Sequence, residues 1–325
     1  MRTANAARSA RPPRSEEECS VSTIDELKLV KGGETIAQVC LDIVAFSFTA
    51  KAADPGGFLS FYETFRKHFG GEFRWWQDAD MKKRRPVDAD SLEMMPFWMS
   101  DSKALASSLL GLYFHSGPSA KTLAPPMLNF HFNEVHDGYP MSQHQMVLPA
   151  QTDPESVVAL VSEALETFPL LWGHAGYTLY WDELDYDRDS LAKPWTGGHL
   201  KRHPGLWSQS PIGSIACRLY NGLQSMSWLT FLGSGYTEKL GGQDALQAQL
   251  QGSAEDSPLG QGGCLIKAGD APQLGDVNRQ DILPSYRAVW SALEPVRADE
   301  DALAELWVDG MEIDDMQAWF KRFEQ

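Results

Sequence analysis

Residues 36–50 read IAQVCLDIVAFSFTA, and this stretch decides the fold. It is rich in β-branched and aromatic residues and alternates locally, which predicts a strand. The sequence PGG at 55–57 then interrupts the pattern. Aromatic residues at helical spacing follow over 58–69, and the glycines at 70–71 provide a stop. We therefore expect this strand to lead directly into a helix.

The next part of the chain continues the sheet. Short, alternating apolar segments bounded by Gly, Pro and Asn predict antiparallel strands at 109–115, 127–135 and 141–148. A helix is expected over 152–168, because Thr152 and Glu155 have the spacing of a capping box ahead of an apolar stripe. A strand over 170–181 follows and runs into the acidic stretch 182–189.

The second half of the chain has the same mixture of elements. Strands are expected at 215–220, 226–232 and 264–268, helices at 236–240 and 285–293, and a loop at 250–263. The last helix has Asp314 and Asp315 at its start and Lys321 and Arg322 near its end, charges that complement the helix dipole. The predicted fold class is α+β, mainly antiparallel sheet with packed helices, built as one fold or as two similar subdomains.

The division of the chain follows its composition. Residues 1–30 are expected to form a disordered basic leader, because residues 1–14 hold four arginines and no acid. Residues 31–190 and 191–325 are expected to be the N-terminal and C-terminal α+β halves of one globular domain.

The charge balance is acidic. The chain of 325 residues holds 28 Lys and Arg against 44 Asp and Glu, a net charge of −16. Such a surface repels nucleic acid and anionic membranes and attracts a basic partner. No apolar run reaches the roughly 18 residues that cross a bilayer. Four scattered cysteines without a CxxC pair fit a reducing compartment. We therefore expect a cytoplasmic protein that binds neither nucleic acid nor membrane directly.

Motifs of known chemistry are missing from the sequence. No GxxxxGK[ST], HExxH, GxSxG or GxGxxG after a strand occurs. One candidate metal site combines Glu134, His136 and His144, while His131 would point to the other face of its strand. Two or three ligands are fewer than a zinc site needs, so polar residues on a solvent-facing sheet are the favoured interpretation.

A second candidate for metal binding is the acidic sequence Asp185-Tyr186-Asp187-Arg188-Asp189. Its spacing resembles the start of a calcium loop. Ser190 stands where the turn glycine belongs, and Thr196 stands where the bidentate glutamate belongs, so an EF-hand is excluded. We expect no enzyme, no bound metal and no cofactor.

Two acidic stretches are candidate binding surfaces for a basic protein. Tyr and Trp residues beside acids make suitable anchors, because they are enriched at interface hot spots. The competing interpretation is that these acids solvate a loop and begin a helix. The candidate contact residues are Asp182, Glu183, Asp185, Tyr186, Asp187, Asp189 and Trp195 in the first stretch and Asp309, Glu312 and Asp315 in the second.

Several short blocks carry a family resemblance. They are WGHAGY at 172–177, RHPGL at 202–206, WLTFLG at 228–233, LGG at 240–242, and LIKAGD at 265–270 running on to GDVNR at 275–279. In order and spacing they resemble a bacterial family of type VI secretion system immunity proteins, which protect against VRR-Nuc or related nuclease toxins. The resemblance extends over roughly residues 36–290.

The resemblance implies a cytoplasmic antitoxin that binds and neutralises a cognate nuclease effector and protects the producing cell. It supplies no catalytic residues. From the charge we expect the cognate toxin to be basic. Two alternatives stay open: a metal-dependent hydrolase using Glu134, His136 and His144, and an adaptor that loads an effector for secretion and then releases it.

Overall fold

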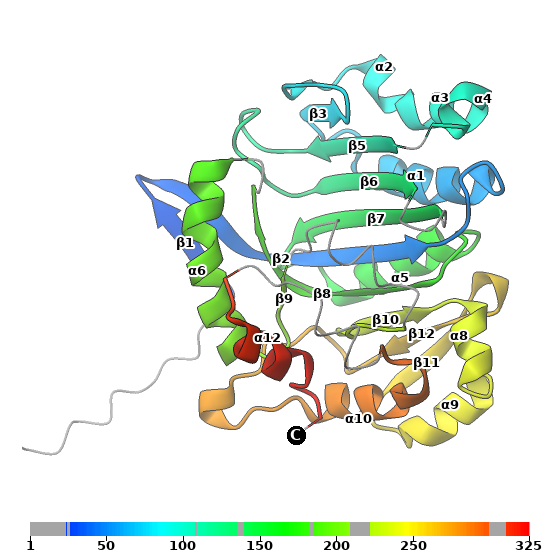
Figure 1. Ribbon diagram of the computed structural model, residues 1–325, viewed down its shortest axis with the longest axis vertical. Coiled ribbons are helices and arrows are strands. Elements are labelled where there is room, and N and C mark those ends of the chain that lie inside the picture. The colour runs from blue at the N-terminus through cyan, green and yellow to red at the C-terminus, as the bar shows by residue number, and fades with distance from the viewer. Residues whose placement is uncertain are drawn as a thin grey trace, which may run out of the picture.

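The structure is a computed structural model that describes residues 24, 27–107, 109–134, 140–182, 185–208, 222–298 and 310–324. In these residues, twelve strands form one sheet with the order β11-β12-β10-β8-β2-β7-β6-β5-β3-β4; β1 pairs with β2, and β9 with β8 (Figure 1). All pairings are antiparallel except that of β8 with β9. The predicted α+β class is confirmed.

The strands are β1 Lys28–Lys31, β2 Glu34–Ser47, β3 Trp75–Asp78, β4 Arg85–Pro86, β5 Leu109–His115, β6 Met127–Glu134, β7 Pro140–Pro149, β8 Trp172–Trp181, β9 Trp207–Ser208, β10 Leu229–Leu232, β11 Glu255–Leu259 and β12 Gly263–Lys267. The α-helices are α1 Pro55–Phe69, α2 Ala89–Leu92, α3 Met94–Ser100, α4 Ser102–Leu105, α5 Pro154–Leu165, α6 Tyr186–Arg202, α8 Ser234–Lys239, α9 Gln243–Leu250, α10 Pro284–Ala292 and α12 Ile313–Phe320. Short 3-10 turns are η4 Gly260–Gly262, η5 Val277–Arg279 and η6 Glu294–Val296.

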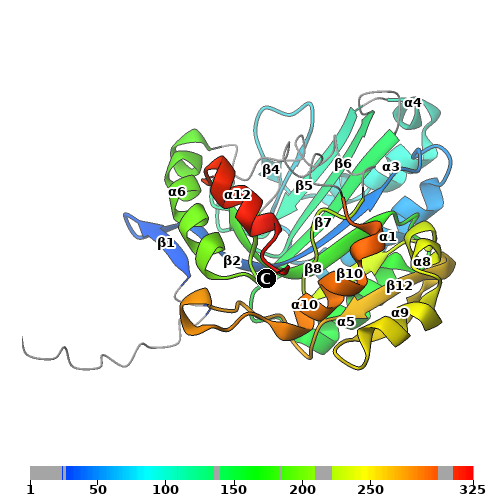
Figure 2. The ribbon, with the colours of Figure 1, turned by 60° about the horizontal axis from the view of Figure 1, so that its bottom comes forward.

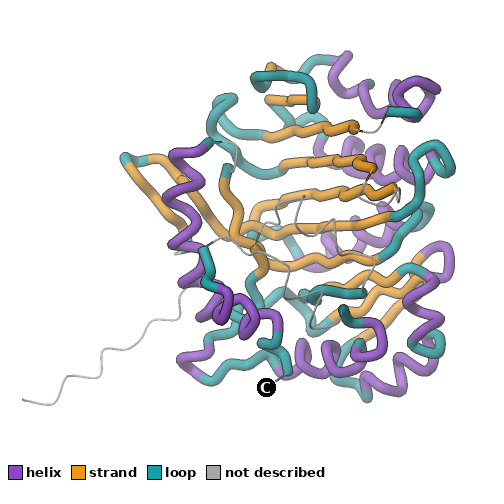
Figure 3. Tube along the Cα trace, viewed as in Figure 1, coloured by secondary structure: helices purple, strands orange, loops and turns teal. Residues whose placement is uncertain are grey.

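Strand β2 is the centre of the sheet, as the opening stretch predicts. It pairs with β7 over Cys40–Ser47 and with β8 over Ala37–Phe46. Its inner residues are buried on both faces, which explains why the sequence there is almost continuously apolar. The predicted strands at 109–115, 127–135 and 141–148 are β5, β6 and β7, and the tube in Figure 3 shows them continuing the sheet.

Helices α1 and α5 pack on one face of this sheet, behind it in Figure 1. Phe58 and Phe61 of α1 meet Phe130 of β6 and Phe168, which follows α5, with ring centroids 5.1–5.9 Å apart. Buried aromatic rings in edge contact supply much of the apolar burial of such a core. The aromatic helix predicted over 58–69 is confirmed.

Three sequence predictions need correction. Asp153, not Thr152, caps α5: its Oδ2 accepts from the Ser156 N–H at 2.9 Å, while the Thr152 hydroxyl donates to the Pro149 carbonyl at 2.7 Å. The helix therefore begins one residue later, directly at Pro154. Residues 28–30 belong to β1 rather than to a disordered leader. Part of the loop predicted at 250–263 pairs with β12 as strand β11.

Helix α6 is the largest departure from the sequence prediction, which placed no helix over residues 186–202. It contains Pro194, and Gly197 lies where a Cβ would come within 1.9 Å of the Gly310 carbonyl oxygen. That glycine therefore serves close packing of α6 against the segment that leads into α12. Both views show α6 and α12 side by side (Figures 1 and 2).

Some predictions lie outside the described residues, including the strand at 215–220 and most of the leader. The boundary at residue 190 stays a prediction; that position lies within α6, and strands from both sides of it share the sheet. Among the described residues, no helix has the length and apolar character needed to cross a membrane.

Candidate functional site

The first acidic stretch begins helix α6. The Asp185 carboxylate accepts hydrogen bonds from the backbone N–H groups of Asp187 and Arg188, at 3.2 and 3.3 Å, and so caps the helix. Tyr186 is 82% exposed, the most exposed large aromatic or aliphatic side chain in the described part of the chain. Asp187 is exposed beside it. The capped helix thus presents an aromatic ring and a carboxylate to solvent on a fixed backbone.

Two other acids of this stretch face inward. Asp182 is buried and accepts from both terminal nitrogens of Arg84, at 2.7 and 3.0 Å. Asp189 accepts from the Trp181 indole N–H at 3.0 Å and pairs with Lys193 at 2.7 Å. These carboxylates are bound within the protein, so they position the start of α6 rather than offer free charge. Glu183 lies outside the described residues.

A basic cluster, formed by Lys82, Lys83 and Arg84 in the connection between β3 and β4, lies next to this stretch. A hollow of about 530 Å³ brings the cluster together with the start of α6. The lining residues are Gln77, Lys82, Lys83, Arg84, Ala120, Lys121, Asp182, Asp185 and Tyr186. The surface around Tyr186 therefore carries charges of both signs. Only the arrangement of distant segments could have revealed this, since Lys82 and Tyr186 are far apart in the sequence.

A second hollow of about 480 Å³ shares Lys121 and Asp185 with the first. The tip of the β1–β2 hairpin forms its wall through Lys31 and Glu34. Arg188 of α6 ties this hairpin down: it pairs with Glu34 at 2.7 Å and donates to the Thr35 carbonyl at 3.1 Å. Segments from four parts of the chain thus converge around the start of α6.

Trp195 is not an exposed anchor. Its ring is half-buried, packs against the hydrophobic core and lies 4.5 Å from the His199 ring one turn along α6. The prediction that Trp195 offers a hot-spot side chain therefore has no geometric support, and its contacts are those of packing.

The second acidic stretch lies at the other end of α6. Glu312 is exposed just before α12, and Asp315 pairs with Lys201 of α6 at 2.9 Å. Asp309 lies outside the described residues. At a rise of about 1.5 Å per residue, the fifteen steps from Tyr186 to Lys201 span roughly 22 Å. The two predicted acidic surfaces thus lie at opposite ends of α6, within the reach of a single partner.

Of the residues proposed to bind a metal, only the His144 side chain is described, and it lies in the core. His144 of β7 is fully buried among aromatic rings, stacked on Phe58 at 5.2 Å and in edge contact with Phe130 at 4.6 Å. This burial holds the pKa of His144 well below its ordinary value, so the ring is neutral. His131 pairs in register with Gln143, the neighbour of His144, and so faces the opposite side of the sheet.

The metal-site prediction gains no support from this geometry. His136 and the side chain of Glu134 lie outside the description. The described residues contain no group of three or more His, Cys, Asp or Glu side chains that could hold a metal ion. His144 contributes to the core, as its aromatic surroundings indicate.

Comparisons with known proteins agree with the resemblance seen in the sequence. Residues 58–323 match the profile of a family described as Type VI immunity for VRR-NUC. Among solved structures, the Pseudomonas aeruginosa T6SS protein PA0821 is similar with a TM-score of 0.75 and 18% sequence identity, over 91% of this chain and 87% of that chain. At 18% identity, this similarity shows that the two chains share a fold. No curated protein is a significant match.

Proposed function

The chain belongs to the family of type VI immunity proteins for VRR-Nuc effectors, and we propose that it contacts its effector through the surface that α6 organises. As a member, it binds and neutralises a nuclease effector and so protects the producing cell. The α6 surface comprises Asp185, Tyr186 and Asp187 at the start of the helix and Glu312 and Asp315 beside its end. Neither the hydrolase nor the loading adaptor is supported by this family.

The exposure of Tyr186 is the observation that carries this proposal. A tyrosine with 82% of its surface in water stabilises nothing within its own chain, yet tyrosine is among the residues that dominate binding energy at interfaces. Asp185 caps the helix beneath it, so little backbone freedom is lost when a partner covers the ring.

Charge supports the same surface. A nuclease must present basic groups to the phosphates of DNA. A protein with a net charge of −16 is drawn to such groups and can cover them, so that it competes with DNA without binding DNA itself. We propose inhibition by binding alone, without catalysis. We also propose that it takes place in the cytoplasm, where the effector meets the DNA of the producing cell.

The test is a titration of this protein into the DNA-cleavage reaction of its cognate VRR-Nuc effector, with affinity measured in parallel. Inhibition that is complete at one equivalent, with a dissociation constant near or below about 10 nM, is the expected result. Tight binding that leaves cleavage unchanged would contradict the proposed mode of action. The variant Tyr186→Ala then tests the surface itself.

A further inference from the structure

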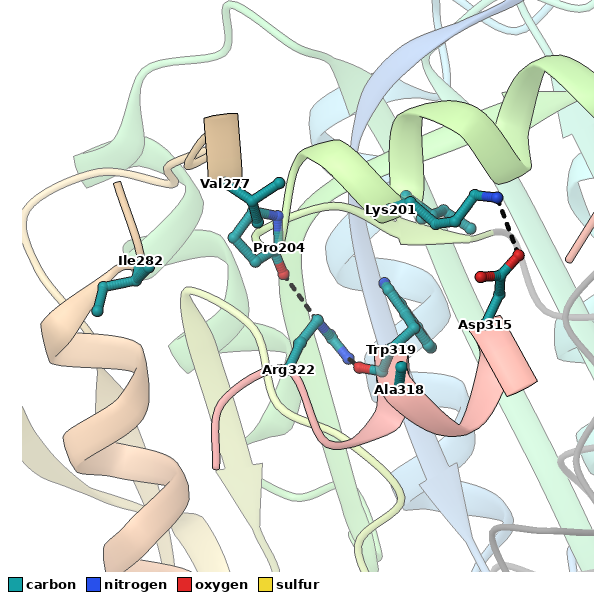
Figure 4. A pocket seen from close by; sticks show the side chains of 9 residues that line it. Lys201, Pro204, Val277, Ile282, Asp315, Ala318, Trp319 and Arg322 are labelled. Atoms are coloured by element: carbon teal, nitrogen blue, oxygen red, sulfur yellow. Dashed lines mark hydrogen bonds and ion pairs between the residues drawn. The ribbon is translucent and has the colours of Figure 1, made fainter. Parts of the chain in front are cut away.

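A pocket of about 320 Å³ lies beside the end of α6, at the opposite end of that helix from Tyr186. Three segments build it: the end of α6, the loop that contains η5, and α12 with the residues just after it (Figure 4). Its lining residues are Leu200, Lys201, Pro204, Val277, Ile282, Asp315, Ala318, Trp319 and Arg322.

Among the described residues, Arg322 in this pocket donates its hydrogen bonds to neutral oxygens. Its Nε donates to the Pro204 carbonyl at 2.7 Å, one terminal nitrogen to the Trp319 carbonyl at 2.9 Å, and the other to the Ser225 hydroxyl at 3.0 Å. Within the described ranges, no carboxylate forms an ion pair with it. A guanidinium has five N–H donors, so two have no acceptor among the residues that the structure describes.

The guanidinium is held in place by aromatic rings. It lies over the Trp319 ring, 3.9 Å from the centroid, and 4.5 Å from the centre of the Phe323 ring. Burial lowers the pKa of Arg322 to about 9, which still leaves it charged at neutral pH. Its three hydrogen bonds and the two ring contacts offset part of the hydration that this charge loses on burial, and a carboxylate would offset more.

The other charges of the pocket cancel. Asp315 and Lys201 pair with each other at 2.9 Å on one wall, as the dashed line in Figure 4 shows. Arg322 therefore leaves the pocket with one positive charge, although the chain as a whole is acidic. The electrostatics of this pocket favour an anion, although the pocket lies beside the acidic stretch at the C-terminal end of the chain.

The rim opposite Arg322 is apolar and exposed. Val277 and Ile282 are 47% and 45% exposed. The loop that carries them is fixed by Asp276, which accepts from Arg202 at 2.7 Å and is bridged to Asp281. A cation beside two aliphatic side chains on a fixed loop matches a carboxylate that has an apolar neighbour.

We propose that this pocket receives an acidic side chain of the nuclease effector, with an adjacent apolar residue packed on Val277 and Ile282. The inference rests on the proposed function in taking the effector as the partner. The carboxylate accepts the two remaining N–H groups of Arg322, and charge-assisted hydrogen bonds of this kind are stronger than neutral ones.

The rim variants Val277→Asp and Ile282→Asp test this pocket without touching the core. Each places a negative charge on the rim where the effector's apolar residue would pack, close to the effector's carboxylate, so lost apolar burial and charge repulsion are expected to raise the dissociation constant for the effector by about tenfold or more. The matched control is Phe97→Asp on α3, because Phe97 is 57% exposed and α3 lies at the far end of the sheet (Figure 1). This control is expected to bind as the wild type does.

The variant Arg322→Gln removes the charge and is expected to weaken effector binding by a similar factor. Thermal unfolding of each variant shows whether it is folded, and the rim variants keep the test decisive if Arg322→Gln is not. Rim variants that bind the effector with wild-type affinity would overturn the pocket inference alone. A wild-type protein that fails to bind the effector would instead overturn the proposed function and the inference with it.

Discussion

Arg84 holds Asp182 through two hydrogen bonds, of 2.7 and 3.0 Å, across 98 positions of sequence. Asp182 directly follows strand β8 and is the first residue of the acidic stretch. Arg84 belongs to the basic cluster in the connection between β3 and β4. Both side chains are largely buried, with 14% and 6% of their surfaces exposed for Arg84 and Asp182. This pair therefore joins the acidic and basic segments that surround Tyr186.

Replacing Arg84 by alanine is expected to destabilise the protein by about 2–3 kcal/mol, because the buried Asp182 carboxylate loses the two charge-assisted hydrogen bonds that Arg84 donates. Urea unfolding of Arg84→Ala measures this loss. Lys83→Ala is the matched control, since Lys83 is exposed in the same cluster, and it should change stability by less than about 0.5 kcal/mol. The double variant with Asp182→Ala should recover part of the loss; equal stability of the single and double variants would contradict the role of the pair.

The Tyr186→Ala variant is expected to weaken effector binding by about 2 kcal/mol or more, as hot-spot tyrosines do, while leaving the unfolding midpoint unchanged. The midpoint is unaffected because Tyr186 is 82% exposed. Calorimetric titration against the effector and thermal unfolding measure the two quantities. Unchanged affinity would place the interface on another face of the molecule.

Reversing the charge at Asp187 is expected to slow association with the effector several-fold at low salt and to have less effect at high salt, since screened charges steer less. Stopped-flow association of Asp187→Lys over a range of ionic strength measures this. Asp187 suits the experiment better than Asp185, because the Asp185 carboxylate caps α6 and its loss would also weaken the helix. An association rate equal to that of the wild type at every salt concentration would argue against steering by this end of α6.

The central strands of the sheet could be predicted from the sequence, whereas its short edge strands and the site could be predicted only in part. Strands such as β2 and β7 have alternating or continuous apolar patterns that tertiary context does not override. Helix α6 lacks an apolar stripe and contains Pro194, so local preference argues against it. It is held by contacts distant in sequence, among them the pair of Arg188 with Glu34.

The individual site residues show the same limit. Acidity was visible in the sequence, but the burial of Asp182 and the exposure of Tyr186 depend on which segments fold over them. Arg322 was expected to complement the dipole of the last helix, and it does donate to the Trp319 carbonyl. That it also lines a pocket, without an ion-pair partner among the described residues, follows from the packing of three separate segments.

Asp42 gives the protein a stability that depends on pH. It is buried in β2 with one carboxylate oxygen accepting from Gln145 at 2.9 Å, and burial raises its pKa from 3.8 to about 7 against the smaller opposing effect of that hydrogen bond. The folded state therefore binds a proton on Asp42 more tightly than the unfolded chain does, and this protonation stabilises the fold. The stabilisation is fully present below pH 3.8. It is lost as the pH rises to about 7.

The variant Asp42→Asn removes this titration and keeps an acceptor for Gln145. Its stability relative to the wild type is therefore expected to rise between about pH 4 and pH 7, by up to about 4 kcal/mol, and to level off above that range. Urea midpoints of both proteins, measured at intervals from pH 4.5 to pH 8, give the difference directly. The exposed Asp187→Asn serves as the control and should follow the wild type throughout. If the Asp42→Asn curve also runs parallel to that of the wild type, Asp42 is ionised in the folded protein and its charge must be compensated by a partner other than Gln145.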